Sequence, residues 1–213
     1  MDLDAKKIIR IIILIIIIVA AVAFYRDRAG VRRSVAGIRA PIQEEAKGVT
    51  KTTVKGWNVR IEYQYSYDIE ALVVHTKRYS GSGLGDQLAP VDAALAWGDV
   101  AKYNDSIDFH WGQARRWYTW KVNSYEELAP VGAEYEVGIQ SSNNHLIPST
   151  RELEKQVKKL RTGDHVRIKG YLVNIDGTKS DGSTFWWNSS TTREDTGDGA
   201  CEVFYVTELQ WLD

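Results

Sequence analysis

The sequence predicts one apolar N-terminal transmembrane helix followed by a single β-rich α+β domain, mostly antiparallel sheet with one or two short helices. Three observations support this fold class. Residues 8–25 are almost entirely apolar, residues 57–67 alternate between apolar and polar side chains, and a helical repeat of apolar residues follows Pro148. After the apolar segment and a linker, roughly 160 residues remain, enough for one domain with a real core.

The apolar segment 8–25, IIRIIILIIIIVAAVAFY, is the first predicted element. A bilayer core needs about 20 mostly apolar residues in a helix, and these 18 residues reach the short end of that range. Lys6 and Lys7 before the segment, and Arg26 and Arg28 after it, can reach the lipid headgroups. The segment therefore predicts the lipid bilayer as a partner and a single-pass location in the inner (cytoplasmic) membrane.

The same residues also fit a secretory signal peptide, with a small-residue exit at Ala21-Val22-Ala23. The apolar run is longer than a typical signal-peptide core of about 7–15 residues, which favours an uncleaved signal anchor. The flanking cations are nearly balanced, but large domains translocate largely regardless of charge. We therefore expect the C-terminal domain to be extracytoplasmic (periplasmic), with a cytoplasm-facing domain as the alternative.

The predicted division of the chain has four parts: an N-terminal tail at 1–7, the anchor at 8–25, a basic juxtamembrane stalk at 26–50, and the β-rich domain at 51–213. From residue 34 to the end, 20 Lys and Arg residues face 25 Asp and Glu residues. This acidic excess makes nonspecific nucleic-acid binding unlikely, because such binding needs a basic face. One cysteine excludes an internal disulfide and a multi-cysteine zinc site.

The first strands of the domain are predicted between residues 57 and 75. Trp57 to Tyr67 place apolar and aromatic side chains on one face and polar side chains on the other, which predicts a half-buried strand. Residues 69–75 predict a second strand or a continuation of the first. The GSGLG segment at 81–85 predicts a flexible loop, and without a following Lys-Ser/Thr it is not a phosphate-binding loop.

The middle of the domain is predicted as one short helix and two strands. Pro90 and Asp92 introduce the apolar run 93–97, which favours a short helix. The aromatic segment 107–122 and the alternating segment 135–139 favour strands.

The C-terminal part begins with the clearest helix. Ser149 and Glu152 have capping-box spacing, and apolar residues recur at helical intervals up to Leu160. Residues 165–175 predict a strand with a bulge at Gly170. Residues 184–188 and 201–209 predict the last two strands.

Two sets of segments carry a resemblance to known proteins. The segment 162–175, opening TGDHVRIKGYLV, and the terminal CEVFYVTEL resemble the first and last strands of small OB-type barrels. The strings SSNNHLIPS, HWGQARRWYTW and TTREDTGDGACE resemble blocks of an uncharacterised bacterial membrane-anchored family. The resemblance implies a partly open OB-like barrel with a face for oligonucleotides or oligosaccharides. The acidic charge favours the second ligand class.

An aromatic and arginine-rich cluster is the predicted binding site. On one strand its members would alternate between two faces, so that half of them are exposed. Guanidinium groups beside aromatic planes suit a glycan or protein partner, and they also suit cation–π packing within a sheet. The predicted binding residues are Trp111, Arg115, Arg116, Trp117, Tyr118 and Trp120.

A catalytic set would have to use Cys201 with His145 or His110. A thiol near an imidazole can act as a nucleophile, and His145 follows Asn143 and Asn144 in a predicted loop. The acidic residues around Cys201 favour a structural cysteine instead, because they disfavour the thiolate. The four histidines lack metal-ligand spacing, so we predict no metal site and no cofactor.

The leading functional prediction is a membrane-tethered extracytoplasmic binding or accessory module that is not an enzyme. The alternative is a cysteine/histidine-dependent hydrolase using Cys201. A further alternative is a cytoplasm-facing membrane signalling module. The sequence leaves the ligand, the partner and the oligomeric state open.

Overall fold

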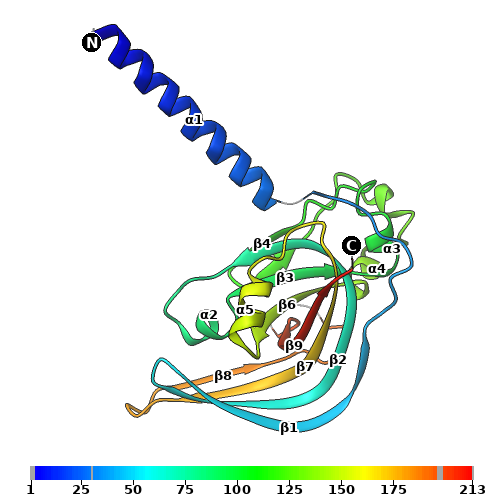
Figure 1. The fold of residues 1–213 in the computed structure, drawn as a ribbon. Coiled ribbons are helices and arrows are strands. Elements are labelled where there is room, and N and C mark those ends of the chain that lie inside the picture. Colours follow the sequence, from blue (N-terminus) through cyan, green and yellow to red (C-terminus); the bar gives the residue numbers. More distant parts are fainter. Residues whose placement is uncertain (1–2, 30, 196–198, 213) are drawn as a thin grey trace. The chain divides into compact units, whose positions relative to one another are not determined.

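The computed structural model describes residues 3–29, 31–195 and 199–212 (Figure 1). The chain divides into two compact units, Met1–Val31 and Arg32–Asp213. The first unit contains helix α1 (Leu3–Ala29). The second unit contains all the described strands, and it confirms the prediction of a β-rich domain.

The predicted transmembrane helix at residues 8–25 is wrong. Within the described residues, no helix has the length and apolar character needed to cross a membrane. The predicted segment of 18 residues already lay at the short end of the range that a span requires. The finding also corrects what depended on that segment: a signal anchor, a single-pass inner-membrane location and an extracytoplasmic domain.

Seven strands of the second unit form one mixed sheet in the order β1-β2-β3-β6-β9-β7-β8. These strands are β1 (Ile42–Val54), β2 (Trp57–Arg78), β3 (Val91–Ala96), β6 (Ser141–Pro148), β7 (His165–Thr178), β8 (Thr184–Asn188) and β9 (Glu202–Trp211). The β6–β9 pair is parallel, and the other pairs are antiparallel.

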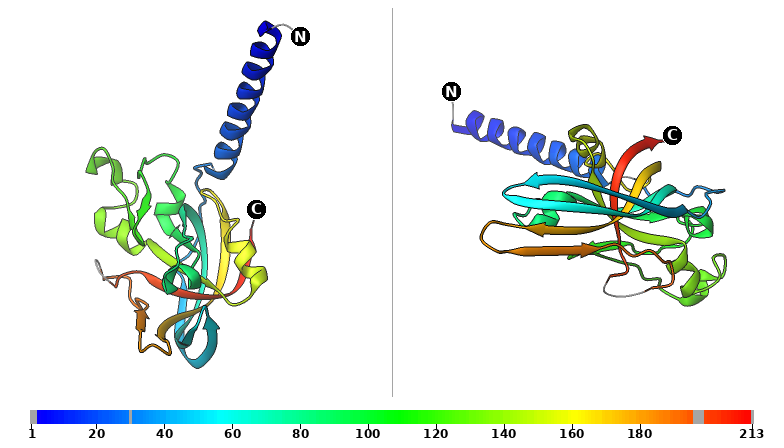
Figure 2. Two further views of the ribbon diagram at one scale, coloured as in Figure 1. Left: turned by 90° about the vertical axis from the view of Figure 1, so that its left-hand side faces the viewer. Right: turned by 90° about the horizontal axis from the view of Figure 1, so that it is seen from below.

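An additional pairing of β2 with β7 closes five of these strands into a ring. The ring runs β2-β3-β6-β9-β7 and returns to β2, so the domain contains a closed barrel and not an open sheet. The long strands β2 and β7 continue beyond the ring, where β1 and β8 flank them (Figures 1 and 2).

The remaining elements are short. The helices are α2 (Leu84–Leu88), α3 (Gly98–Lys102), α4 (Glu134–Ile139) and α5 (Arg151–Val157), with a 3₁₀ turn at Tyr125–Leu128. Strands β4 (Gly112–Ala114) and β5 (Trp117–Thr119) pair as a separate hairpin. This hairpin, α3, α4 and the 3₁₀ turn all belong to the segment that connects β3 with β6.

The core consists of two clusters of buried apolar side chains. The larger cluster includes Ile69, Leu95 and Phe204. The smaller cluster includes Ile175 and Val203. Each fully buried aliphatic or aromatic side chain of this size contributes about 1.5–3 kcal/mol of transfer free energy, so the two clusters give the sheet its main stabilisation.

Three predicted elements in the middle of the chain have a different structure. The run 93–97 lies mostly in strand β3, whose residues are all buried between β2 and β6. A strand that is buried on both faces shows no alternation, so its apolar run looks like a short helix. Within 107–122 only β4 and β5 are strands, and residues 135–139 lie in helix α4.

The predicted stalk at 26–50 also needs revision. The compact second unit begins at Arg32, and residues 42–50 belong to β1. Strand β1 is mostly exposed, so it lacks the apolar alternation that would have indicated a strand.

The predictions for 57–67, 165–175, 184–188 and 201–209 are confirmed, since these segments fall in β2, β7, β8 and β9 with small differences at the ends. The β7–β9 register shifts between Lys169 and Gly170, which confirms the predicted bulge. Helix α5 is also confirmed, but it begins one residue later than the capping-box spacing indicated. Its N-cap is Thr150, whose hydroxyl accepts a hydrogen bond from the Leu153 amide.

Candidate functional site

The turn between β4 and β5 positions the arginine pair of the predicted binding cluster. Arg115 and Arg116 both have positive φ angles, 52° and 72°. A two-residue hairpin turn of this kind usually contains Asn-Gly, because side chains with a Cβ are strained there. Contacts made by Arg116 hold this turn in place.

Arg116 contacts two carboxylates and a backbone carbonyl. Its guanidinium lies 2.6 Å from Asp92 Oδ1 and 2.5 Å from Asp86 Oδ1, and it donates to the Ala89 carbonyl at 2.9 Å. It also stacks on the Tyr79 ring, 3.7 Å from the centroid. Asp92 is fully buried, so Arg116 compensates a charge that would otherwise be costly. The primary role of Arg116 is therefore structural.

Asn143 lies in a buried strand, β6, and not in the predicted loop. Gln113 of the hairpin donates to Asn143 Oδ1 at 2.5 Å, and Asn143 Nδ2 donates to the Arg116 carbonyl at 2.8 Å and to the Cys201 sulfur at 3.4 Å. These hydrogen bonds satisfy a buried amide, which is why a polar side chain can occupy this position.

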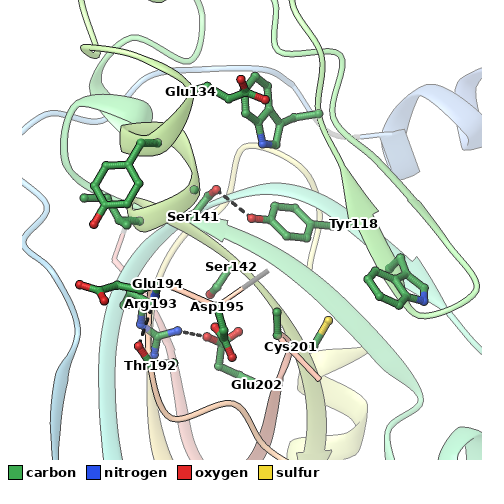
Figure 3. Close-up of a pocket in the computed structure, with 16 residues that line it drawn as sticks. Tyr118, Glu134, Ser141, Ser142, Thr192, Arg193, Glu194, Asp195, Cys201 and Glu202 are labelled. Atoms are coloured by element: carbon green, nitrogen blue, oxygen red, sulfur yellow. Dashed lines mark hydrogen bonds and ion pairs between the residues drawn. The ribbon is translucent and has the colours of Figure 1, made fainter. Parts of the chain in front are cut away.

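A cavity of about 470 Å³ opens beside the hairpin (Figure 3). We call it the aromatic–acidic pocket. It lies between β5, helix α4, the start of β6, the loop that precedes residue 196, and the start of β9. Its lining includes Trp117, Tyr118, Trp120, Glu134, Tyr135, Ser141, Ser142, Arg193, Glu194, Asp195, Cys201 and Glu202.

Aromatic side chains form the walls of the pocket. Trp117 and Tyr135 are 41% and 58% exposed. Tyr118 is more enclosed, and its hydroxyl lies 3.3 Å from Ser141 Oγ (Figure 3). Burial raises the pKa of the Tyr118 hydroxyl, so this group is a neutral hydrogen-bonding group at neutral pH.

An ion pair between Arg193 and Glu202 lies at the base of the pocket (Figure 3). Arg193 also donates to the Tyr67 hydroxyl at 3.1 Å and to Gln43 Oε1 at 3.3 Å. Glu202 is 1% exposed, and its Oε2 is a buried atom without a hydrogen-bond partner among the described residues. The ion pair with Arg193 therefore leaves one oxygen of this buried carboxylate without a hydrogen-bond donor among the described residues.

A second cavity, of about 500 Å³, contains Cys201 and His145 in its lining. His145 Nδ1 lies 2.9 Å from Asp92 Oδ1, although the two atoms do not have hydrogen-bond geometry, and the imidazole packs against Trp187 with centroids 4.6 Å apart. We call this cavity the cysteine–histidine cavity. It shares Trp117 and Cys201 with the aromatic–acidic pocket.

The structure divides the predicted binding residues into two groups. Trp117, Tyr118 and Trp120 line the aromatic–acidic pocket. Trp111 instead donates from its indole to Asn104 at 2.8 Å, and Arg115 is exposed at the hairpin turn.

Of the two predicted histidines, only His145 lies near Cys201. His145 shares a cavity with Cys201. His110 lines neither of the two cavities that Cys201 lines, and its Nε2 lies 3.3 Å from Asn123 Oδ1 on the surface.

Most of the pocket residues were not among the predicted site residues, and these include Glu134, Tyr135, Arg193 and Glu202. Tyr135 lies within the segment 135–139 that was predicted as a strand, and Glu134 directly precedes it. Both residues belong to helix α4. Arg193 and Glu202 lie in the sequence REDTGDGACE, in which only Cys201 was predicted as a candidate site residue. The available signal was an arginine and several acidic residues close to the cysteine in this segment.

Among the described residues, no group of three or more His, Cys, Asp or Glu side chains is arranged to hold a metal ion. No protein-family model, curated protein or solved structure matches this chain.

Proposed function

We propose that the domain is a binding module whose ligand enters the aromatic–acidic pocket. The observation that carries the proposal is the exposure of Trp117 and Tyr135 at a cavity of about 470 Å³. Small-molecule sites usually have volumes of roughly 300–1,000 Å³. Aromatic rings give a ligand a large contact area and lose little conformational entropy on binding.

The contact surface proposed here differs from the predicted aromatic–arginine cluster. Arg116 is held by Asp86 and Asp92, so it has little capacity to pair with an acidic ligand. The rings of Trp117, Tyr118 and Trp120 remain as the contact groups. A glycan, a small molecule or a side chain of a protein partner can each pack on such rings.

The ring of five strands supports the resemblance to OB-type barrels, which are five-stranded Greek-key barrels. We include this fold type in the proposal. OB-type barrels act mainly as binding domains, so the fold type agrees with a binding function.

The test uses the full chain and three probes: chitotriose, an acetylated and amidated Gly-Lys-Gly peptide, and choline. Binding is followed through the backbone amide signals of the protein in ¹H–¹⁵N spectra. We expect at least one probe to shift the signals of Trp117, Tyr135 and Glu202. Trp117→Ala and Tyr135→Ala should each weaken that binding.

Trp186→Ala is the matched control, because Trp186 is 75% exposed and does not line the aromatic–acidic pocket. This variant should bind like the unchanged protein. The proposal fails if no probe shifts the pocket signals, or if Trp117→Ala and Tyr135→Ala bind as well as Trp186→Ala.

A cysteine hydrolase is the second candidate function, because Cys201 and His145 line one cavity and Asp92 lies beside the imidazole. In such an enzyme His145 would take the thiol proton and the sulfur would attack a substrate carbonyl. The bond to the leaving group would break with return of that proton, and water would then hydrolyse the thioester.

Alkylation separates the two candidates. Rapid reaction of Cys201 with iodoacetamide near pH 7 in the folded chain, slowed by His145→Ala, would favour the hydrolase. A thiol that stays unreacted in the folded chain but reacts after unfolding in urea would exclude it.

A further inference from the structure

The aromatic–acidic pocket has a strong excess of negative charge. Four carboxylate side chains line it, those of Glu134, Glu194, Asp195 and Glu202, against the single guanidinium of Arg193. A concave surface with one sign of charge and low-dielectric walls concentrates the electric field and attracts counter-ions. The lining therefore favours a positively charged ligand over a negatively charged one.

Arg193 cannot neutralise the whole set. Its guanidinium is paired with Glu202 and is further held by the Tyr67 hydroxyl at 3.1 Å. It also lies over the Tyr67 and Trp97 rings, 5.2 Å and 5.8 Å from their centroids. These contacts fix it at the base of the pocket, which leaves the three remaining carboxylates uncompensated by it.

Glu202 differs from the other three carboxylates in its burial. Its side chain is 1% exposed, it lines the pocket, and its Oε2 has no hydrogen-bond partner among the described residues. A buried carboxylate oxygen without a donor is costly. A cation in the cavity would reduce that cost through its charge.

The walls determine the kind of cation. Trp117, Tyr118, Trp120 and Tyr135 line the pocket. The π faces of such rings attract organic cations and give no advantage to an anion. Inorganic cations such as Ca²⁺ and Mg²⁺ need several oxygen ligands that converge on one point, and among the described residues no group of three or more His, Cys, Asp or Glu side chains is arranged in that way.

We infer that the aromatic–acidic pocket binds an organic cation, specifically an alkyl- or quaternary ammonium group. The inference rests on the proposed binding function and names the class of its ligand. An ammonium group can belong to a free small molecule or to a lysine side chain of a protein partner, and the probes below separate these two sources.

The test compares three molecules of nearly equal shape: choline, its neutral analogue 3,3-dimethylbutan-1-ol, and the anion 3,3-dimethylbutanoate. Affinities for the full chain are measured by amide chemical shifts at low salt. We expect choline to bind at least about tenfold more tightly than the neutral analogue, a ratio equivalent to about 1.4 kcal/mol. Binding of choline should weaken as salt is added.

Glu134→Gln and Trp120→Ala should each weaken choline binding about threefold or more, since one removes a charge and the other a π face. Glu126→Gln is the matched control, because it changes the net charge equally but lies outside the pocket lining. Glu202→Gln should act like Glu134→Gln, and its amide spectrum shows whether the fold is retained.

Two further probes, n-butylammonium and the acetylated, amidated Gly-Lys-Gly peptide, identify the source of the ammonium group. Tighter binding of the peptide indicates a protein partner, and tighter binding of choline or n-butylammonium indicates a small molecule.

Equal affinity for choline and its neutral analogue overturns the inference, as does binding of chitotriose alone, and in both cases the binding function stands. Failure of every probe to shift the pocket signals overturns both the organic-cation inference and the proposed binding function.

Discussion

Gly170 occupies the irregular position in the pairing of β7 with β9. A Cβ atom at this position would lie 1.9 Å from the Tyr205 carbonyl oxygen, so the backbone itself would have to move. We expect Gly170→Ala to lower the free energy of unfolding by about 1–3 kcal/mol or more. Urea denaturation of the full chain provides the measurement.

The control for this prediction is Gly83→Ala. Gly83 has an extended backbone with φ of −63°, and a Cβ there would meet no atom within 4 Å. Its substitution should change stability by less than about 0.5 kcal/mol. Equal losses in both variants would show that close packing does not determine the glycine at 170.

Asp68 and Arg167 form a two-point ion pair between β2 and β7, with distances of 2.8 Å and 2.7 Å. The hydrogen bonds from Arg167 lower the pKa of Asp68 below its usual value. A lowered pKa stabilises the folded state above the unfolded pKa near 4, and this stabilisation is lost as the pH falls through the folded pKa.

We therefore expect Asp68→Asn to cost about 1 kcal/mol at pH 7, a modest value because the Arg167 side chain is 42% exposed. The cost should shrink toward zero near pH 2. Denaturation of both proteins at several pH values tests this, and a cost that does not change with pH would contradict it.

Individual residues differ in how far the sequence reveals them. Gly170 was predictable, because a glycine inside an apolar strand indicates a bulge. The Arg115-Arg116 turn was not predictable, because its positive φ angles depend on Asp92 and Asp86, which lie far away in the sequence. A local pattern cannot show a strain that distant contacts offset.

At the scale of single elements, α5 allows a direct comparison of two adjacent hydroxyl residues. Thr150 caps the helix through its side chain, whereas the Ser149 amide bonds to the Val206 carbonyl. Thr150→Ala should lower stability by about 1 kcal/mol through loss of the cap.

Ser149→Ala is the matched variant and should change stability by less than about 0.5 kcal/mol. Thermal or urea unfolding of the two variants distinguishes the observed cap from the one that capping-box spacing indicated. A larger loss for Ser149→Ala would contradict the observed helix start.

The errors in the predicted elements have three physical causes, and in each case the local sequence lacks the pattern of the element that forms. Strand β3 is buried on both faces, so it has no alternation. Strand β6 contains Asn143, Asn144 and His145, which look like loop residues until their buried partners are known. Helix α4 is only six residues long, too short to show a helical period.

The candidate site could be predicted only in part, because some of its residues are distant from one another in the sequence. Trp117, Tyr118 and Trp120 are close in sequence, so their cluster was visible. Glu134 and Glu202 join them only because α4 and β9 approach the hairpin in the folded domain. Such long-range proximity has no local pattern.

For the whole domain, the closed ring predicts a gradient of stability. Strand β7 lies between β2 on one edge and β8 and β9 on the other, while among the described strands β1 pairs only with β2. Amides of buried β7 residues such as Ile168 and Leu172 should exchange with solvent about a hundredfold more slowly than those of β1.

Hydrogen exchange of the full chain, followed by mass spectrometry or NMR, tests this gradient. The amides of β8 should exchange at an intermediate rate, because only its pairing with β7 protects them. Uniform exchange across these strands would show that the domain opens as one unit.

The position of β9 has a consequence for how the chain acquires its structure. Strand β9 comes last among the described strands in sequence order, yet it lies between β6 and β7. Until it inserts, β6 and β7 each have an unpaired edge that other chains can bind. Biosynthesis therefore passes through a stage at risk of aggregation, and assembly is slow because segments distant in sequence must meet.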